Sequence, residues 1–333
     1  MDYTQIPKVE LHRHLELSLR HDTIRELAPR AGIDLSTPDR FAQGYLITEP
    51  MQDLTSVLHK FLVVQPLFET EAIIERIAYE ACEDAYADGI RLLELRYAPT
   101  FITQSYEHMN FDRAHEAILR GIHRAQQDFS MGVGLIGIIQ RTLAVADARA
   151  VAEFVIANSD TFIGLDMADD DSSPIDVKVF APLFERAKAA GLGITVHAGE
   201  SNTPEAPKFV KSVIDYLGAD RIGHGVQMHQ YPEMIDYLVE KDVPLELCVT
   251  SNWLTQAIET LPAYPFRLFM EAGVKTTINS DDPSIFNISL SSEYELLHRI
   301  HGFNDAEFRH CNRIAARASF LPEEIKQRYW QDL

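Results

Sequence analysis

PKVELHRH, residues 7–14, decides the fold, because a short apolar run ends there in two histidines. Residues 8–12 are predicted as a buried strand. Seven further segments of this kind follow, most of them after an amphipathic helical pattern that a Gly or Asp ends: 91–97 (RLLELRY), 134–139 (GLIGII), 162–166 (FIGLD), 194–197 (ITVH), 221–224 (RIGH), 244–248 (PLELC) and 274–279 (VKTTIN). Eight strands alternating with helices predict one α/β domain over residues 1–333, a single (β/α)8 TIM-type barrel. A helical insertion after the first strand, residues 21–88, is expected to cap its mouth.

The composition of the chain indicates which kinds of molecule it is expected to bind and in which compartment. With 30 Lys and Arg against 50 Asp and Glu, the net charge of −20 disfavours nucleic acid and anionic membranes. The longest apolar stretch, around 131–139, is too short to cross a bilayer, and no targeting signal is visible. Three widely spaced cysteines without a CxxC pair predict neither a disulfide framework nor a thiolate metal site. We therefore expect a cytoplasmic protein with a small-molecule partner, and the oligomeric state stays open.

The predicted strands end in polar residues of a particular kind. In such a barrel the active site lies at the carboxyl ends of the strands. Ordinary loop residues are expected there, but these strands end in histidines and acids: His12, His14, His197, Glu200, His224, Asp281 and Asp282. Histidines and acids at these positions favour a functional site over ordinary core or loop residues.

A metal site is the chemistry that this set favours. His12 and His14 stand at i and i+2, so both side chains point to the same face of the strand and can bind one ion. Imidazole nitrogens and a carboxylate oxygen suit Zn²⁺, and His12, His14, His197 and Asp281 are the predicted ligands, with a position left for water. A His-x-His pair can also arise by chance, and His197 taken alone could be a core histidine.

The other polar residues fit proton transfer and substrate binding. Glu200 is placed to give or take a proton if burial raises its pKa. His224 could orient or deprotonate the water. Asp282 could accept a hydrogen bond from the substrate, or be a turn residue before Pro283. The acidic run 169–171 follows the fourth strand and faces the same mouth, although such a run can equally be a solvated loop.

Four ordered motifs resemble the adenosine deaminase family, a branch of the amidohydrolase superfamily. They are PKVELHRHLE, TVHAGE, RIGHGV and NSDDPSIF, with support from ELRYAP at 94–99 and LELCVTSN at 245–252. The resemblance implies hydrolytic removal of the 6-amino group of an adenine ring, with release of ammonia. It also implies one Zn²⁺ held by the four predicted ligands, with Glu200 as proton donor to ring N1, His224 as the residue that activates water, and Asp282 as the partner of N7.

Three positions depart from the pattern of adenosine-specific members. Glu16 stands where those members usually have an Asp that meets the ribose, and Leu17 replaces a Gly. Asp169 stands where the family commonly has a Gly that offers its amide to purine N3. Glu16 and Asp169 are accordingly predicted as substrate contacts. Adenosine and 2′-deoxyadenosine are the expected substrates, and free adenine or a modified adenine nucleoside is the alternative.

Two other functions fit parts of the pattern. A barrel phosphoesterase shares the first-strand His-x-His, but such enzymes generally assemble two or three metals with further acids or a bridging lysine, and 162–166 contains no lysine. A non-catalytic purine-binding barrel would be expected to have lost a metal ligand or Glu200, and all are present.

Overall fold

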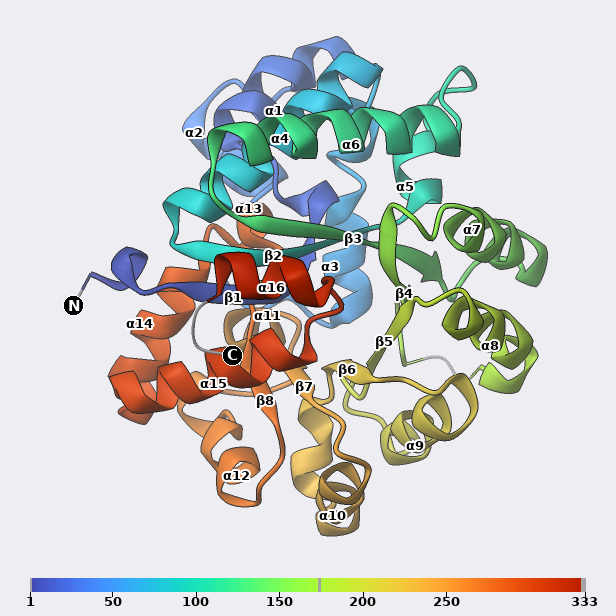
Figure 1. Ribbon diagram of the computed structural model, residues 1–333. Helices are drawn as coiled ribbons and strands as arrows, with labels where there is room; N and C mark the ends of the chain where they lie inside the picture. The colour runs from blue at the N-terminus through green and yellow to red at the C-terminus, as the bar shows by residue number, and fades with distance from the viewer. Residues whose placement is uncertain (1, 173–174, 331–333) are drawn as a thin grey trace.

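The eight predicted strands are present and form a single barrel (Figure 1). The structure is a computed structural model that describes residues 2–172 and 175–330. All strand pairs are parallel, in the order β1 to β8. The strands are β1 (Lys8–His14), β2 (Ile90–Tyr97), β3 (Gly132–Gln140), β4 (Phe162–Ala168), β5 (Gly193–Ala198), β6 (Arg221–His224), β7 (Leu245–Leu247) and β8 (Thr276–Ile278). The predicted (β/α)8 barrel is confirmed.

The seam of the barrel lies between β1 and the residues that follow β8. The Asp281 amide donates to the His12 carbonyl at 2.9 Å, and the His14 amide donates to the Asp281 carbonyl at 3.0 Å. Arg13 and Asp281 form an isolated parallel bridge. Backbone pairing at the seam therefore fixes His12, His14 and Asp281 beside one another.

Helices surround the sheet and connect successive strands (Figure 1). Side-chain caps mark the starts of two long ones, since Thr70 accepts from the Ile73 amide and Asn110 from the Arg113 amide. The connecting helices are α4 (Glu71–Ala87), α6 (Phe111–Asp128), α7 (Val145–Ala157), α8 (Ala181–Ala189), α9 (Ala206–Leu217), α10 (Pro232–Lys241) and α12 (Phe266–Glu271), followed by α14 (Leu290–His301), α15 (Asp305–Ala318) and α16 (Glu323–Tyr329). Short helices directly follow three strands: α5 (Pro99–Thr103), α11 (Val249–Leu254) and α13 (Pro283–Phe286).

The segment between β1 and β2 departs from the regular alternation. It contains α1 (His21–Leu27), α2 (Pro38–Gly44) and α3 (Leu54–Phe61) before α4. α4 packs against α6 and β2, so residues 71–87 form an ordinary outer helix of the barrel. The additional helices of the expected 21–88 insertion are thus α1 to α3.

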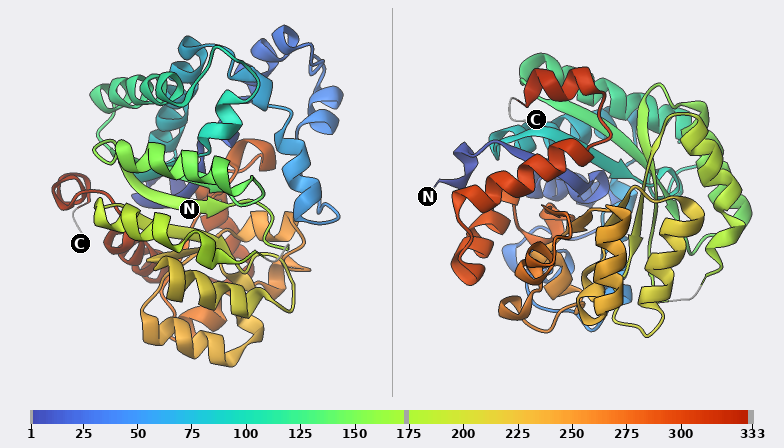
Figure 2. Two further views of the ribbon diagram at one scale, coloured as in Figure 1. Left: turned by 90° about the vertical axis from the view of Figure 1, so that its right-hand side faces the viewer. Right: turned by 60° about the horizontal axis from the view of Figure 1, so that its bottom comes forward.

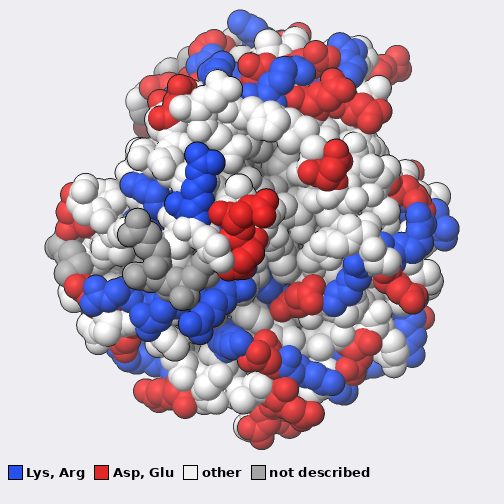
Figure 3. All heavy atoms as spheres, viewed as in Figure 1, with Lys and Arg blue, Asp and Glu red and all other residues white. Residues whose placement is uncertain are grey.

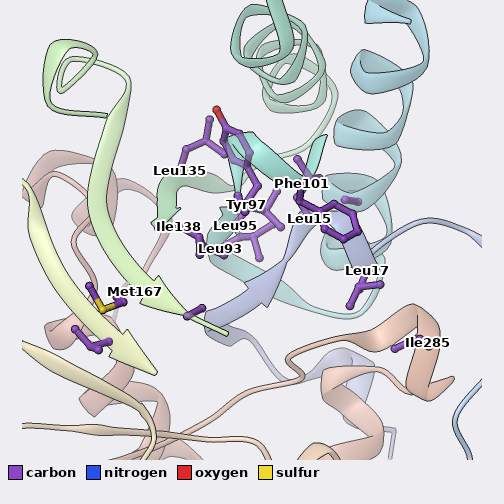
Figure 4. Packing of buried hydrophobic residues seen from close by; sticks show 14 of the residues in the cluster. Leu15, Leu17, Leu93, Leu95, Tyr97, Phe101, Leu135, Ile138, Met167 and Ile285 are labelled. Atoms are coloured by element: carbon purple, nitrogen blue, oxygen red, sulfur yellow. The ribbon is translucent and has the colours of Figure 1, made fainter. Parts of the chain in front are cut away.

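The hydrophobic core has a large and a small part. The large part fills the space between sheet and helices, where side chains of β2 and β3 such as Leu93, Tyr97 and Leu135 meet (Figure 4). The small part lies under α15 and α16, at the amino ends of the strands: Val9, Leu11, Leu92, Ala315, Ala316, Leu321 and Trp330. In the left view of Figure 2 these red C-terminal helices lie on one side of the barrel and the blue segment that includes α3 lies on the other. The C-terminal helices thus cover the amino ends of the strands, and α3 lies on the opposite side of the barrel.

Within residues 2–172 and 175–330, no helix combines the length and the apolar character needed to cross a bilayer. Acidic and basic side chains lie intermixed over the face seen in Figure 3.

Candidate active site

The predicted metal ligands and proton-transfer residues meet at the carboxyl end of the barrel. β1 supplies two histidines, β5 and β6 supply one each, and the acids follow β5 and β8. Except for His14, which is partly buried, these residues are almost completely buried: His12, His197, Glu200, His224, Asp281 and Asp282. The fold thus joins four segments that are distant in the sequence.

The donor atoms of the four predicted ligands converge. The Nε2 atoms of His12 and His14 each lie 3.3 Å from Asp281 Oδ1, and His14 Nε2 lies 3.2 Å from His197 Nε2. Donors bound to one Zn²⁺ at about 2.1 Å are separated by roughly these distances. His12, His197, His224 and Asp281 also form a buried group whose ligand atoms lie within 4.8 Å of one another. The cluster could hold a metal ion.

The outer nitrogens of two histidines are held by carboxylates. His12 Nδ1 lies 2.8 Å from Glu246 Oε2, and His197 Nδ1 lies 3.0 Å from Asp166 Oδ2. Such partners put the proton on Nδ1 and leave Nε2 free to bind a metal. His12 Nε2 is buried and has no hydrogen-bond partner. Burial lowers the pKa of His197 to about 3, against the opposing effect of Asp166, which keeps the ring neutral as a ligand must be. The residues therefore fit a bound cation.

Glu200 has the environment of a proton donor. Burial, together with the nearby Asp281 and Asp171, raises its pKa well above the usual value of a glutamate. Thr255 Oγ1 donates to Glu200 Oε1 at 3.1 Å, while the Glu200 amide donates to Asp171 at 3.0 Å. Gly199, at φ 70°, makes the turn that places Glu200 after β5. These surroundings favour the protonated form of the Glu200 carboxyl group.

His224 lies between Glu200 and the ligand cluster. Its Nε2 is 3.5 Å from Glu200 Oε2 and 3.9 Å from Asp281 Oδ2. On the other side, Asn252 Nδ2 lies 3.0 Å from His224 Nδ1, and the Tyr264 hydroxyl donates to Asn252 Oδ1. Burial lowers the pKa of His224 well below the usual value, so the ring is neutral.

Backbone strain is concentrated at this end. Three non-glycine residues of the site adopt left-handed conformations: Asp169 (φ 95°), His224 (φ 61°) and Asp281 (φ 61°). Each such residue costs about 1–3 kcal/mol and persists only where its surroundings over-determine it. In this conformation the side chains of His224 and Asp281 lie close to each other in the site, with His224 Nε2 3.9 Å from Asp281 Oδ2.

Two further acids present unpaired oxygens. Glu16 Oε1 accepts from the Ala98 amide at 2.5 Å, but Glu16 Oε2 has no partner; Asp282 Oδ1 has none either. Burial raises the pKa of Glu16 to about 8 and, with Asp281 close by, raises that of Asp282 well above normal. Both acids are suited to meet a ligand group. The Asp169 carboxylate, by contrast, accepts from the Thr142 hydroxyl, in the loop after β3, and from the neighbouring Asp170 amide.

A pocket of about 400 Å³ opens beside these residues. Its lining includes His14, Glu16 and Asp169, with Leu58 and Phe61 of α3 and no lysine or arginine. Leu58 and Phe61 also border the small cavity next to Glu200 and Asp281. α3 therefore forms part of the cover of the site.

Several residues that shape the site were not singled out from the sequence. Glu246, Asp166 and Arg96 hold or neighbour the ligand histidines, while Asn252 and Thr255 contact His224 and Glu200. The strand sequences RLLELRY, FIGLD and PLELC did carry a signal, because charged residues are rare in strands buried on both faces.

Comparisons with known proteins show which family and which solved structures this chain is similar to. The family model described as Adenosine deaminase matches residues 7–333. An adenosine deaminase of Plasmodium falciparum is 31% identical over 330 residues, covering 98% of this chain and 89% of that protein. Among solved structures, the adenine deaminase of Arthrobacter aurescens superposes with a TM-score of 0.87 at 25% identity, covering 96% of each chain. A Burkholderia ambifaria amidohydrolase with bound Zn has a TM-score of 0.86 at 27% identity, covering 99% of this chain and 90% of that chain.

Proposed function

Because the chain belongs to the adenosine deaminase family and is a hydrolytic deaminase, we propose that it converts adenosine and 2′-deoxyadenosine to inosine and 2′-deoxyinosine with the help of one Zn²⁺. The observation that carries this proposal is the short distance between the proposed ligand atoms: Nε2 of His12 and of His14 each lie 3.3 Å from Asp281 Oδ1, and His14 Nε2 lies 3.2 Å from His197 Nε2. Zn²⁺ bound there would supply an activated water as the nucleophile at C6.

Glu200 is proposed to protonate the ring. Its raised pKa favours the protonated carboxyl group, and donation of that proton to N1 makes C6 more electrophilic as the ring loses its aromaticity. Thr255 holds the carboxyl group in place from the side of Oε1. A general acid of this kind contributes about 10²–10⁴-fold to a rate.

His224 is proposed to orient the attacking water. The neutral ring is fixed through Nδ1 by Asn252, so Nε2 faces the space between Glu200 and Asp281. Because the Asn252 amide nitrogen faces Nδ1, the neutral ring carries its proton on Nε2, from which it can donate to an oxygen. This arrangement favours orientation of the water and stabilisation of developing negative charge over simple proton removal.

Two acids with unpaired carboxylate oxygens and one backbone amide are proposed to contact the rest of the substrate. Asp282 Oδ1 is available to the N7 edge of the purine, Glu16 Oε2 to a sugar hydroxyl, and the Asp169 amide to N3. The 400 Å³ pocket beyond His14 would take the sugar, and α3 would close over it as the expected cap. The absence of lysine and arginine from that lining favours an uncharged substituent over a phosphate.

Free adenine is the second candidate substrate. Glu16 replaces the aspartate of adenosine-specific relatives, and the Arthrobacter aurescens structure superposed above is that of an adenine deaminase. In this case Glu16 Oε2 would contact the N9 side of the ring instead of a sugar hydroxyl.

The cellular setting is also a proposal. Cys82, Cys248 and Cys311 are buried and unpaired, which is typical of a reducing compartment. We infer a cytoplasmic enzyme that acts on a small purine and binds neither nucleic acid nor membranes.

A side-by-side assay tests the proposed function. Adenosine, 2′-deoxyadenosine, free adenine and a modified adenine nucleoside are compared by the fall in ultraviolet absorbance on deamination, with metal content measured on the same sample. Turnover of the two nucleosides by protein that holds about one Zn²⁺ per chain is expected. Turnover of adenine alone would replace the nucleoside proposal by the second candidate, and a metal-free protein inert on all four compounds would refute the proposed chemistry.

A further inference from the structure

Arg96 lies at the centre of a buried network of charges beneath the metal cluster. Its side chain, on β2, is fully buried. Arg96 Nη1 donates to Asp166 Oδ2 at 2.9 Å, and Arg96 Nη2 donates to Glu246 Oε2 at 2.8 Å. Nη2 also donates to the Leu11 carbonyl at 2.6 Å, next to the first ligand histidine. One guanidinium thus bridges two carboxylates that come from β4 and β7.

The same two carboxylates hold the ligand histidines. Glu246 Oε2 lies 2.8 Å from His12 Nδ1, and Asp166 Oδ2 lies 3.0 Å from His197 Nδ1. The very oxygens that face Arg96 are therefore those that face the imidazoles. His12 and His197, from β1 and β5, are connected through a single side chain on β2.

Asp166 and Glu246 need a cation between them, because both are carboxylates buried in the barrel. Two buried carboxylates close to each other repel, and without a neutralising partner one of them would take up a proton. Arg96 lies within ion-pair distance of both carboxylates, and Glu246 has a second cationic partner in Arg221. An ionised carboxylate is what accepts the Nδ1 proton of a ligand histidine.

Arg221 offers a natural comparison. It is as deeply buried as Arg96 and also bridges two carboxylates, with Nε 2.6 Å from Glu246 Oε1 and Nη2 2.6 Å from Glu94 Oε2. Glu94 accepts from Ser319 and Phe320 at the opposite end of the barrel. Arg221 therefore joins the network to the C-terminal segment, and only one of its two partners faces a ligand histidine.

We propose that Arg96 is a positioning residue for the metal site, because it fixes Glu246 and Asp166 together so that His12 and His197 present Nε2 to one ion. The inference rests on the proposed metal site and adds to it a residue that does not touch the metal or the substrate. A planar fork is required for this role, since a lysine ammonium is a point charge without the parallel donors of a guanidinium.

The test compares Arg96→Lys with Arg221→Lys in the full-length protein. Both variants keep the charge and change an equally buried arginine. The dissociation constant for Zn²⁺ is measured by competition with a chromophoric chelator, and thermal unfolding of the metal-free protein is measured in parallel. Loss of an outer partner of a metal ligand typically weakens metal binding about 10–100-fold. We expect a loss in this range for Arg96→Lys and less than about threefold for Arg221→Lys, whatever the change in thermal stability.

Two results would overturn the inference. Zn²⁺ affinity of Arg96→Lys within threefold of the original protein would show that the bridge is not needed, and equal losses in both variants would show a general effect of damage to the core. Should the original protein itself bind no Zn²⁺, the proposed function fails, which is a different outcome from failure of the variant alone.

A second measurement applies if Arg96→Lys does not fold. Asp166→Asn, Glu246→Gln and the double variant, all with Arg96 present, are titrated with Zn²⁺ in the same way. If one guanidinium couples the two carboxylates, the changes in the logarithm of the Zn²⁺ dissociation constant in the two single variants will not add up to the change in the double variant. Strict additivity would overturn the inference.

Discussion

At the amino ends of the strands, Val9 and Leu92 pack against Ala315 and Leu321 under the last two helices, whereas the carboxyl ends carry histidines and acids. The first region is covered, and the buried charges that it contains are paired, as between Arg221 and Glu94. In the second, His12 Nε2, Glu16 Oε2 and Asp282 Oδ1 are buried without partners, and His224 and Asp281 are in left-handed conformations. Buried polar atoms without partners cost free energy, so the carboxyl end is built for ligands at the expense of stability. The two ends should therefore respond differently to change.

Removal of the metal is expected to have the largest effect. Dialysis against a strong chelator should abolish turnover, because the activated water is lost, and addition of Zn²⁺ should restore it. The measurement is steady-state deamination together with circular dichroism. Unchanged turnover after removal of all metal would mean that the carboxyl end does not work as described.

Glu200→Gln should have the next largest effect. The amide cannot donate the proton that a carboxylic acid gives, so kcat should fall by about 10²–10⁴-fold. Metal content should remain at the level of the original protein, because Glu200 is not among the proposed ligands. Loss of the metal from this variant would instead place Glu200 in the metal site.

Leu321→Ala probes the covered end. Leu321 is 4% exposed, and truncation of a buried leucine typically costs about 2–5 kcal/mol. We expect a lower unfolding temperature with kcat within about twofold of the original value at 25 °C. A large loss of kcat in folded protein would contradict the division between the two ends.

Thr255→Val should give the smallest effect and tests the sign of a pKa shift. The Thr255 hydrogen bond lowers the pKa of Glu200, against the raising effect of burial. Loss of this bond should raise that pKa further, so the protonated acid survives to higher pH and the alkaline limb of the kcat profile moves upward. Thr255→Ser, which keeps the hydroxyl, is the matched control, and a downward shift of the alkaline limb in the valine variant would contradict the assignment.

Much of the fold followed from local patterns. Each of the eight strands overlaps a predicted apolar run, and four of these runs end at or shortly before His12, His197, His224 or Asp281. Strands buried on both faces can be recognised in this way because their sequences are almost continuously apolar. The single barrel followed from their alternation with helices. The boundary between the inserted helices and the regular helix α4 did not follow, since it is the packing of α4 on α6 that identifies α4 as an outer helix of the barrel.

The site could be predicted as a set of residues but not as a connected structure. The motifs name His12, His14, His197, Glu200, His224, Asp281 and Asp282 because each stands at a strand end. The partners Glu246, Asp166 and Arg96 lie within β7, β4 and β2 and were not among the predicted site residues, although a charge buried in a strand needs a partner. Which partner it finds depends on neighbouring strands that are far apart in the sequence.

The sequence by itself determined the class of fold, the family and the residues able to bind a metal and to move a proton, because these depend on periodicity and on the chemistry of individual side chains. Only the tertiary structure decided how those residues are connected: the seam that pairs His12 with Asp281, the bridge of Arg96 between two carboxylates, and the position of α3 over the pocket. The physical reason is that distances between segments remote in the chain, and the burial that shifts the pKa of Glu200, exist only once the barrel has closed.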